Sequence, residues 1–507
     1  MRKIFLLLHF CFFAFFSKAQ IGINTGTPWE FLKGDSAVPQ SMPVYGVMGS
    51  ESEGNNPGRA RQNSVTWKDA EGNLWLFGGL KLGSPWNYFN DLWKYNPLTN
   101  QWVFMKGDNI SNVKGSYGIR GVANDANKPG GRMGSVGWTD ADGNLWLFGG
   151  HGFYSSEGYS GFEVGLLNDL WKYNPNTNQW TWIKGDNSIG SVFGNGFYGI
   201  KGFSAEANNP SGRGSSVSWK DASGNFWLFG GYGYTPISGS GHFQLNDLWK
   251  YNPLSNEWTW MKGDSLGDSY PVYGIQGVPA SANTPGSKIP NSNWIDNAGN
   301  FWLFGGYESH YDTVTYSSEY GNTNDLWKYE PSTNNWTWMK GDTVFNSLPV
   351  YGIPGIGDLS NKPGSGGIGS ETWKDASGNL WLFQLNSLWK YNPSNNQWTW
   401  MQGDTTVLVS GSNYGIKGVS DPANRPGGRS FPASWRDDAG NFWLFGDGDF
   451  SGNYKNDLWK FNPVNLQWTW MKGDSTNAFN IPAVFGTQGF TSEGNHPGAR
   501  EGSVMWK

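Results

Sequence analysis

The amino-acid sequence predicts an all-β fold, a seven-bladed β-propeller with six complete four-stranded blades and a seventh blade shared by the two chain ends. One sequence unit recurs along the chain, with Trp, Gly, Tyr and Asn at matching positions. Each unit holds four short, aromatic-rich runs separated by turn residues, which is typical of antiparallel strands. Because repeat folds grow by adding units, all 507 residues fit one repeated architecture instead of several unrelated domains.

The first unit shows how the four strands of a blade are expected to follow one another. Its predicted strands are residues 64–67, 74–79, 90–97 and 102–108. The turn at 69–73 places Gly72 where a bulged hairpin needs a left-handed residue. In the fourth strand, paired Trp such as Trp180 and Trp182 share one sheet face, because side chains alternate along a strand.

The repeat count predicts how the ring closes. The Trp of the second strand recurs six times, at Trp75, Trp146, Trp227, Trp302, Trp381 and Trp443. Residues 29–35 match a fourth strand, and residues 500–507 match a first strand. An N-terminal strand that completes the last blade removes the free edges of a propeller. We therefore expect these segments to share a seventh blade, truncated because the sequence stops before its second and third strands.

The spacing of key residues within the unit supports a family resemblance. The first unit has Gly78-Gly79, then Tyr95, then Trp102, and an Arg stands six residues before the first-strand Trp. That leading Arg recurs at Arg61, Arg132, Arg213, Arg429 and Arg500. The pattern resembles the kelch repeat, as in the propeller domain of galactose oxidase and in bacterial exported kelch proteins. The fifth and sixth units depart from it, since they lack the Gly-Gly pair. A shared fold does not transfer an activity.

The N-terminus has the composition of a signal peptide. Arg2 and Lys3 precede an apolar run over 4–16, and Ser17 and Ala19 put small residues at the expected cleavage site. We expect residues 1–19 to be removed and residues 20–507 to form a single propeller domain. The sequence thus predicts export to the periplasm, cell surface or extracellular space, with no membrane insertion after cleavage.

The net charge and the cysteine content argue against two classes of function. The formal net charge of −5 gives no electrostatic footprint for nucleic acid. The copper site implied by the galactose oxidase resemblance needs a Tyr crosslinked to Cys, but Cys11 is the only Cys and lies in the signal peptide. The remaining histidines fall in loops of different units without ligand spacing: His151, His242, His310 and His496. Copper-radical oxidase activity is therefore not supported.

The variable segments between second and third strands are the expected binding region, because loops on a rigid scaffold usually carry recognition. Of the 32 Trp, Trp86 alone lies off the repeat, in the first of these segments. Exposed aromatic side chains stack on sugar rings or pack against proteins. The alternative interpretation is that these residues only pin their own loops. The candidate ligand-binding residues are Trp86, Tyr88, Phe153, Tyr154, Tyr232, Tyr234, Tyr311 and Tyr454.

A weak calcium signal and two alternative functions complete the predictions. Asp447, Asp449 and Ser451 place oxygen ligands at alternate positions, as a calcium loop does, but Leu458 stands where the bidentate Glu is needed. No other cofactor and no catalytic residue is expected. We predict a scaffold that binds a glycan or a protein. A carbohydrate-active enzyme, such as the sugar mutarotases of the kelch type, and a structural surface protein are the alternatives.

Overall fold

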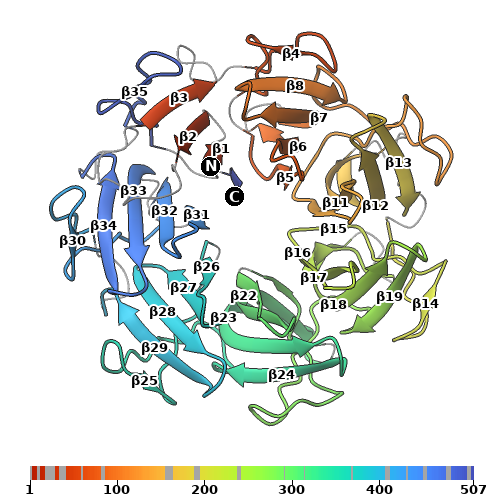
Figure 1. The fold of residues 1–507 in the computed structure, drawn as a ribbon. Helices are drawn as coiled ribbons and strands as arrows, with labels where there is room; N and C mark the ends of the chain where they lie inside the picture. The colour runs from red at the N-terminus through yellow and green to blue at the C-terminus, as the bar shows by residue number, and fades with distance from the viewer. Residues whose placement is uncertain are drawn as a thin grey trace.

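The computed structural model describes most of the chain. The described ranges are residues 3–7, 12–16, 29–33, 42–58, 61–81, 86–154, 164–187, 194–236, 241–290, 292–312, 314–366, 369–405, 411–429, 432–448, 454–475, 481–499 and 504–506. Within them the structure is built from β-strands. No helix in these ranges is long and apolar enough to cross a membrane. The strands form small antiparallel sheets arranged around a central axis, as in a β-propeller (Figure 1).

Six blades each contain four successive antiparallel strands, numbered outward from the axis. Blade one has β5 (Val65–Lys68), β6 (Leu74–Lys81), β7 (Asn87–Asn96) and β8 (Gln101–Lys106). Blade two has β10 (Val136–Thr139), β11 (Leu145–Phe153), β12 (Val164–Asn174) and β13 (Gln179–Lys184). Blade three has β16 (Val217–Lys220), β17 (Phe226–Gly233), β18 (Phe243–Asn252) and β19 (Glu257–Lys262).

The other three complete blades repeat this order. Blade four has β21 (Ser292–Ile295), β22 (Phe301–Asp312), β23 (Ser317–Glu330) and β24 (Asn335–Lys340). Blade five has β26 (Glu371–Lys374), β27 (Leu380–Gln384), β28 (Ser387–Asn392) and β29 (Gln397–Gln402). Blade six has β31 (Ala433–Arg436), β32 (Phe442–Gly448), β33 (Tyr454–Asn462) and β34 (Gln467–Lys472).

Short strands in the segments between blades extend the sheets in a way the repeat does not predict. In four blades a two-residue strand pairs with the fourth strand at the outer edge: β4 (Glu51–Ser52), β14 (Ser204–Ala205), β25 (Gly357–Asp358) and β30 (Ser420–Asp421). In three blades another pairs with the end of the second strand: β9 (Arg132–Met133), β15 (Arg213–Gly214) and β20 (Lys288–Ile289). The outer strands cover edges that would otherwise offer unpaired backbone groups to another chain.

The blade count corrects the prediction of seven. The six complete blades are confirmed, but the remaining sheet, ordered β35-β3-β2-β1-β36, is not a blade of repeat sequence. It contains β3 (Trp29–Lys33), β35 (Thr491–Ser492) and β36 (Val504–Trp506). Its middle strands are β1 (Lys3–Leu7) and β2 (Phe12–Phe16), from the expected signal peptide. The physical reason is that the chain holds only six copies of the second and third repeat strands. Both chain ends do share this sheet, which lies between blades six and one (Figure 1).

Aromatic contacts between neighbouring blades form the core. The first-strand Trp of one blade stacks on the residue that begins the second strand of the next blade. Trp219 stacks on Phe301 in this way, with 4.9 Å between the ring centroids and an angle of 2° between the ring planes. Trp138 stacks in the same way on Phe226, at 5.0 Å. The buried clusters accordingly run from each blade into the next. Aromatic burial of this kind is among the largest contributions that single side chains make to a core.

A buried Arg–Asp pair explains the Arg and Gly-Gly of the repeat. In blade two, Arg132 donates two hydrogen bonds of 2.7 Å to Asp169, and both residues are almost completely buried. Tyr117 Oη and Trp171 Nε1 also donate to this carboxylate, at 2.7 Å each. Gly149 has φ of +66°, and a Cβ there would lie 2.8 Å from the carbonyl oxygen of Arg213 in the next blade. Glycine is therefore required both by conformation and by close approach.

Candidate functional site

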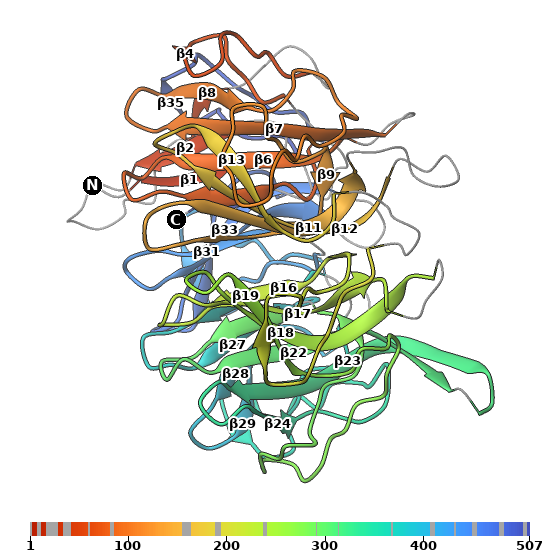
Figure 2. The ribbon, with the colours of Figure 1, turned by 90° about the vertical axis from the view of Figure 1, so that its right-hand side faces the viewer.

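The two faces of the propeller differ in regularity. One carries the short turns between first and second and between third and fourth strands, and we call it the turn face. The opposite, variable-loop face is formed by the described parts of the hairpin ends that lie within residues 80–89, 151–167, 232–245, 307–323, 384–387 and 446–455. In the side view of Figure 2 these hairpin ends lie on the side opposite the two chain ends. We therefore expect a ligand that recognises side chains not repeated in every blade to contact the variable-loop face.

The structure divides the predicted binding residues by exposure. Trp86 is 54% exposed, Tyr311 41% and Tyr232 39%, so a ligand could reach all three. Tyr454 is half-buried. The other four side chains are buried: Tyr88, Phe153, Tyr154 and Tyr234. Burial gives these four a packing role, and Tyr88 and Phe153 pack against each other across two neighbouring blades.

The buried candidates gather with two histidines where blades one, two and three adjoin. Tyr88 Oη lies 2.9 Å from His151 Nδ1, and the ring of Tyr234 lies 4.8 Å from the ring of His242. Tyr154 Oη donates to the carbonyl oxygen of Leu166. Burial lowers the pKa of both histidines, and for His151 the charge of His242 adds to the effect. Burial thus favours the neutral form of both imidazoles.

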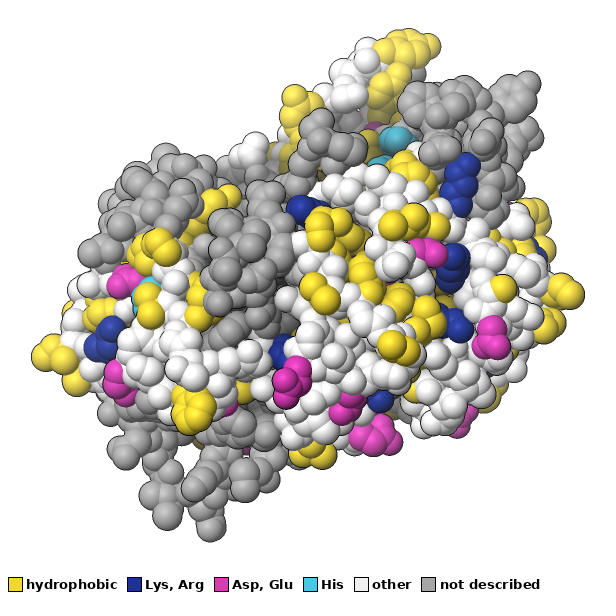
Figure 3. All heavy atoms as spheres, turned by 90° about the horizontal axis from the view of Figure 1, so that it is seen from above, with side chains coloured by type: hydrophobic (Ala, Val, Ile, Leu, Met, Phe, Trp, Pro, Cys, Tyr) yellow, Lys and Arg dark blue, Asp and Glu magenta, His cyan; other side chains and the backbone are white. Residues whose placement is uncertain are grey.

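Among the described residues, blade four has the longest second and third strands. Its strands β22 and β23 span 12 and 14 residues, and their end, residues 307–323, is here called the blade-four arm. Figure 2 shows the arm extending beyond the body of the propeller. Its outer residues are strongly exposed, with Val314 at 84%, Tyr316 at 79% and Tyr320 at 65%. Hydrophobic side chains cap the projection that rises furthest in the space-filling view (Figure 3).

The turn at the tip of the arm is held by its own polar groups. Asp312 accepts hydrogen bonds from the backbone N–H groups of Val314 and Thr315, at 2.7 and 3.1 Å. Tyr316 has φ of +56°, in the left-handed region that a bulky residue rarely adopts. Such an outlier costs free energy and motivates a search for function. Here the residue with this backbone conformation is an exposed aromatic one in the turn between β22 and β23.

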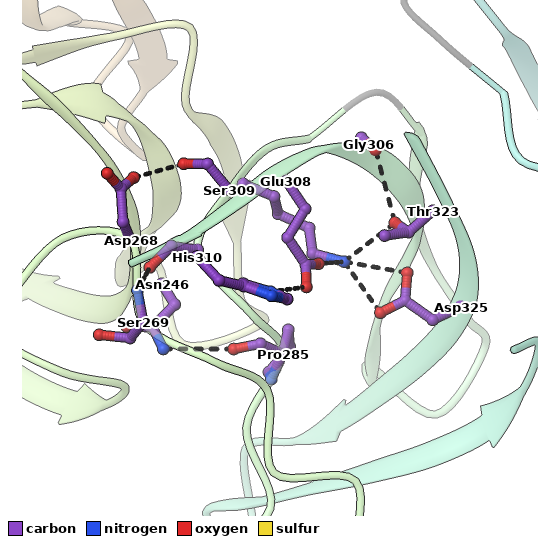
Figure 4. A network of polar contacts seen from close by, with 12 residues as sticks. Asn246, Asp268, Ser269, Pro285, Gly306, Glu308, Ser309, His310, Thr323 and Asp325 are labelled. Carbon is purple, nitrogen blue, oxygen red and sulfur yellow. Dashed lines mark hydrogen bonds and ion pairs between the residues drawn. The ribbon is translucent and has the colours of Figure 1, made fainter. Parts of the chain in front are cut away.

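A buried charge cluster lies at the root of the arm (Figure 4). Lys288 Nζ lies 2.9 Å from both carboxylate oxygens of Asp325 and 2.7 Å from Glu308 Oε2. His310 Nε2 lies 2.6 Å from Glu308 Oε1. These four residues, Lys288, Glu308, His310 and Asp325, are called the root cluster below. His310 is 7% exposed and the other three are fully buried.

Lys288 and Glu308 hold each other in their charged forms. Burial alone would lower the pKa of Lys288, but Asp325 and Glu308 raise it above its ordinary value. Burial would likewise raise the pKa of Glu308, but Lys288 and the hydrogen bond from His310 hold it below its usual range. The cluster therefore keeps a cation and a carboxylate in contact inside the protein, with the Asp325 side chain on the other side of Lys288.

Comparison among blades shows that the root cluster replaces a repeated pair. Lys288 occupies the position of Arg132 and Arg213, and its antiparallel partner is Glu308 where those arginines face Gly152 and Gly233. A Cβ at Gly152 would lie 2.5 Å from Cβ of Arg132, so that site has no room for a side chain. Blade four therefore carries two coupled changes, one on each strand of the pair.

The calcium prediction falls largely outside the described residues. Asp449 and Ser451 belong to the undescribed segment 449–453, and for Asp447 only the backbone, within β32, is described. Among the residues that the structure does describe, no three His, Cys, Asp or Glu side chains are grouped as a metal site. The calcium site therefore stays a prediction.

A cavity of about 500 Å³ lies against the first strands of blades two, three and four. Small or neutral side chains such as Gly137, Ser218 and Asn293 form much of its lining, and none of the predicted binding residues contributes to it. It therefore shares nothing with the aromatic surface of the variable-loop face.

Sequence reasoning named His310 only as a loop residue without ligand spacing, and it missed Lys288. The signal was present, because Lys288 stands six residues before Trp294, where other units have Arg. With the fold and site in view, the chain is a β-propeller. No protein-family model matches the sequence, and no curated protein matches it either.

Proposed function

We propose that this β-propeller is an exported recognition scaffold of the kelch type that binds a glycan or a protein through its variable-loop face. The observation that carries the proposal is the placement of exposed aromatic side chains. Repeat tryptophans are buried in the core, whereas Trp86 is the one Trp among those described whose side chain is more than one third exposed. Tyr232, Tyr311, Tyr316 and Tyr320 add exposed phenols on the same face.

The physical chemistry of these residues suits recognition better than covalent catalysis. Tyr and Trp supply large contact areas at low entropic cost, and they dominate binding energy at many interfaces. The root cluster is covered by its own hairpin, since three of its members have no exposed surface. Its buried charges are therefore not placed to act on a bound substrate, whereas the exposed aromatic rings are placed to contact one.

The test is a glycan array together with affinity capture on the chain lacking residues 1–19, followed by titration of any ligand found. Replacing Trp86 with Ala should weaken binding by about 1–3 kcal/mol if the side chain is an anchor. The matched control is Leu254→Ala, at a residue 95% exposed in a turn-face loop of blade three. Equal affinities for the Trp86 variant, the control and the unaltered protein would refute the assignment of Trp86 to the site.

Export is a separate part of the proposal, supported by the composition of residues 1–19. Mass spectrometry of the secreted or periplasmic product should find a chain that begins at Gln20. Cleavage would also remove β1 and β2, so the exported form would keep only β3, β35 and β36 of the sheet between blades six and one. A product that retains its first 19 residues would contradict the export proposal without affecting the binding proposal.

A further inference from the structure

We propose that the root cluster is a proton-sensitive latch that holds the blade-four arm against its blade when His310 is protonated and loosens it when His310 is neutral. The proposal rests on the proposed function, because it assigns a regulation to the same binding face. It is carried by the coupled replacement in blade four and by the position of His310 between the buried charges and the exposed arm.

The formal charges of the cluster define its two states. With His310 neutral, Lys288, Asp325 and Glu308 sum to −1 in a site without solvent exposure. A proton on Nδ1 of His310 brings the sum to zero, because Nε2 already faces Glu308 at 2.6 Å. Uncompensated buried charge is strongly unfavourable. Loss of the proton therefore favours any movement that returns Glu308 to water.

The blades with the repeated Arg–Asp pair show why the proposed proton sensitivity belongs to blade four. Arg213 and Asp247 form a neutral buried pair with bonds of 2.5 and 2.6 Å, and Gly233 faces the arginine. Burial alone would lower the pKa of Arg213, but Asp247 raises it above its ordinary value, and the pair contains no imidazole that could change its charge near neutral pH. Only the added carboxylate of Glu308 creates a charge that an imidazole has to balance.

The contacts of the arm root show what would move. The N–H of Ser309 donates to the carbonyl of Ser287 at 3.1 Å, and the N–H of Tyr311 donates to that of Asp268 at 2.9 Å. Ser309 Oγ also donates to the Asp268 carboxylate. His310 itself lies between two rings, with centroid distances of 4.3 Å to Tyr270 and 5.0 Å to Phe345. These contacts dock the arm on the segment that leads into blade four, and they all lie within two residues of Glu308 or His310 in the chain.

Most of the charged groups that surround His310 are carboxylates. Glu308 lies on its own strand, and Glu319 is its cross-strand partner on β23. The segment packed against the arm contributes Asp268, and the phenol of Tyr270 interacts electrostatically with Glu319 and Asp312. Lys288, bridged to Asp325, is the one cation of the root cluster. A second proton on the imidazole is thus placed among carboxylates.

Spin labelling of the unliganded protein tests the latch. From residue 20 onward the chain has no Cys, so Thr315→Cys places a single nitroxide at the tip of the arm. Imidazoles titrate between pH 5 and 8, so we expect an ordered label at pH 5.5 and a more mobile one at pH 8. A label at Ser255→Cys, in an exposed turn of blade three, should not change. Equal mobility of the Thr315 label at both values would overturn the proposal.

Two conservative variants separate the latch from a merely structural role, because it predicts opposite behaviour for them. Glu308→Gln removes the charge that needs balancing, so the arm should stay ordered at both pH values. His310→Gln keeps a donor toward Glu308 but cannot be protonated, so the arm should be mobile at both. Lys288→Arg combined with Glu308→Gly restores the ordinary pair and should abolish the pH response. Identical behaviour of the Glu308 and His310 variants would refute the mechanism.

Binding measurements connect the latch to the proposed function. If a ligand contacts the arm, its affinity should be about tenfold higher at pH 5.5 than at pH 8, within the usual range of coupling between sites. Because the label experiment uses unliganded protein, its failure overturns the latch alone. Unchanged binding in variants of Trp86 and the exposed tyrosines would instead overturn the proposed function and leave the latch standing.

Discussion

The buried Arg–Asp pair of the repeat is predicted to contribute strongly to folding, and Asp169→Asn tests this in blade two. The Asp169 carboxylate accepts four hydrogen bonds of 2.7 Å, two from Arg132, one from Tyr117 and one from Trp171. The amide that replaces it is neutral and offers one acceptor oxygen in place of two. Arg132, which is 1% exposed, would then be a buried cation without its anion.

The expected loss is about 3–5 kcal/mol in the free energy of unfolding, the usual result of removing one partner of a buried ion pair. Urea denaturation, followed in parallel by Trp fluorescence and circular dichroism, measures it. Blade five supplies the control, because Ser387 occupies the position of Asp169 and is uncharged, with hydroxyl contacts of 3.4 Å to Asn386 and 3.5 Å to Asp404. Ser387→Ala should therefore cost under about 1 kcal/mol. A loss below 1 kcal/mol for Asp169→Asn, or an equal loss in both variants, would refute the reasoning.

Two further predictions concern the core and alkaline pH. Phe301→Ala removes a fully buried ring that stacks on Trp219 across a blade interface, so it should cost about 3–5 kcal/mol by urea denaturation, whereas the exposed Leu254→Ala should cost almost nothing. Burial raises the pKa of the repeat tyrosines Tyr117 and Tyr198, with their Asp partners adding to the effect. Above about pH 10 the unfolded chain therefore loses phenolic protons that the folded chain keeps, so stability should fall as pH rises further. Absorbance at 295 nm should show these phenols ionising only as the fold is lost; ionisation in the intact fold would contradict the assigned burial.

Much of the fold was predictable because its determinants are local. Strand alternation, turn residues such as Gly72 and the recurring Trp are set within about 50 residues of chain, so each blade can be recognised from its own sequence. The six complete blades followed directly from counting these units. The prediction of a seventh blade was wrong for the same reason. A count of repeated strands does not show which other segments will pair with the strands at the two chain ends.

The candidate site was predicted only in part. The sequence indicated that the hairpin ends would differ among blades and that Trp86 lies off the repeat. It did not distinguish exposed Tyr232 from buried Tyr234, two residues away, because burial depends on side chains brought in from other segments. The sequence also did not predict the outer edge strands, because they are only two residues long.

The sequence by itself determined the all-β class, the blade unit and the identity of the variable segments, because period-two alternation and turn chemistry act between near neighbours. Only the tertiary structure decided which aromatic rings face solvent and that Lys288, Glu308 and His310 meet at the root of one hairpin. The physical reason is that burial and charge pairing are properties of contacts between strands and between blades. Such contacts join Trp138 to Phe226 across 88 positions of the chain, and no local pattern encodes which side chains will be left outside them.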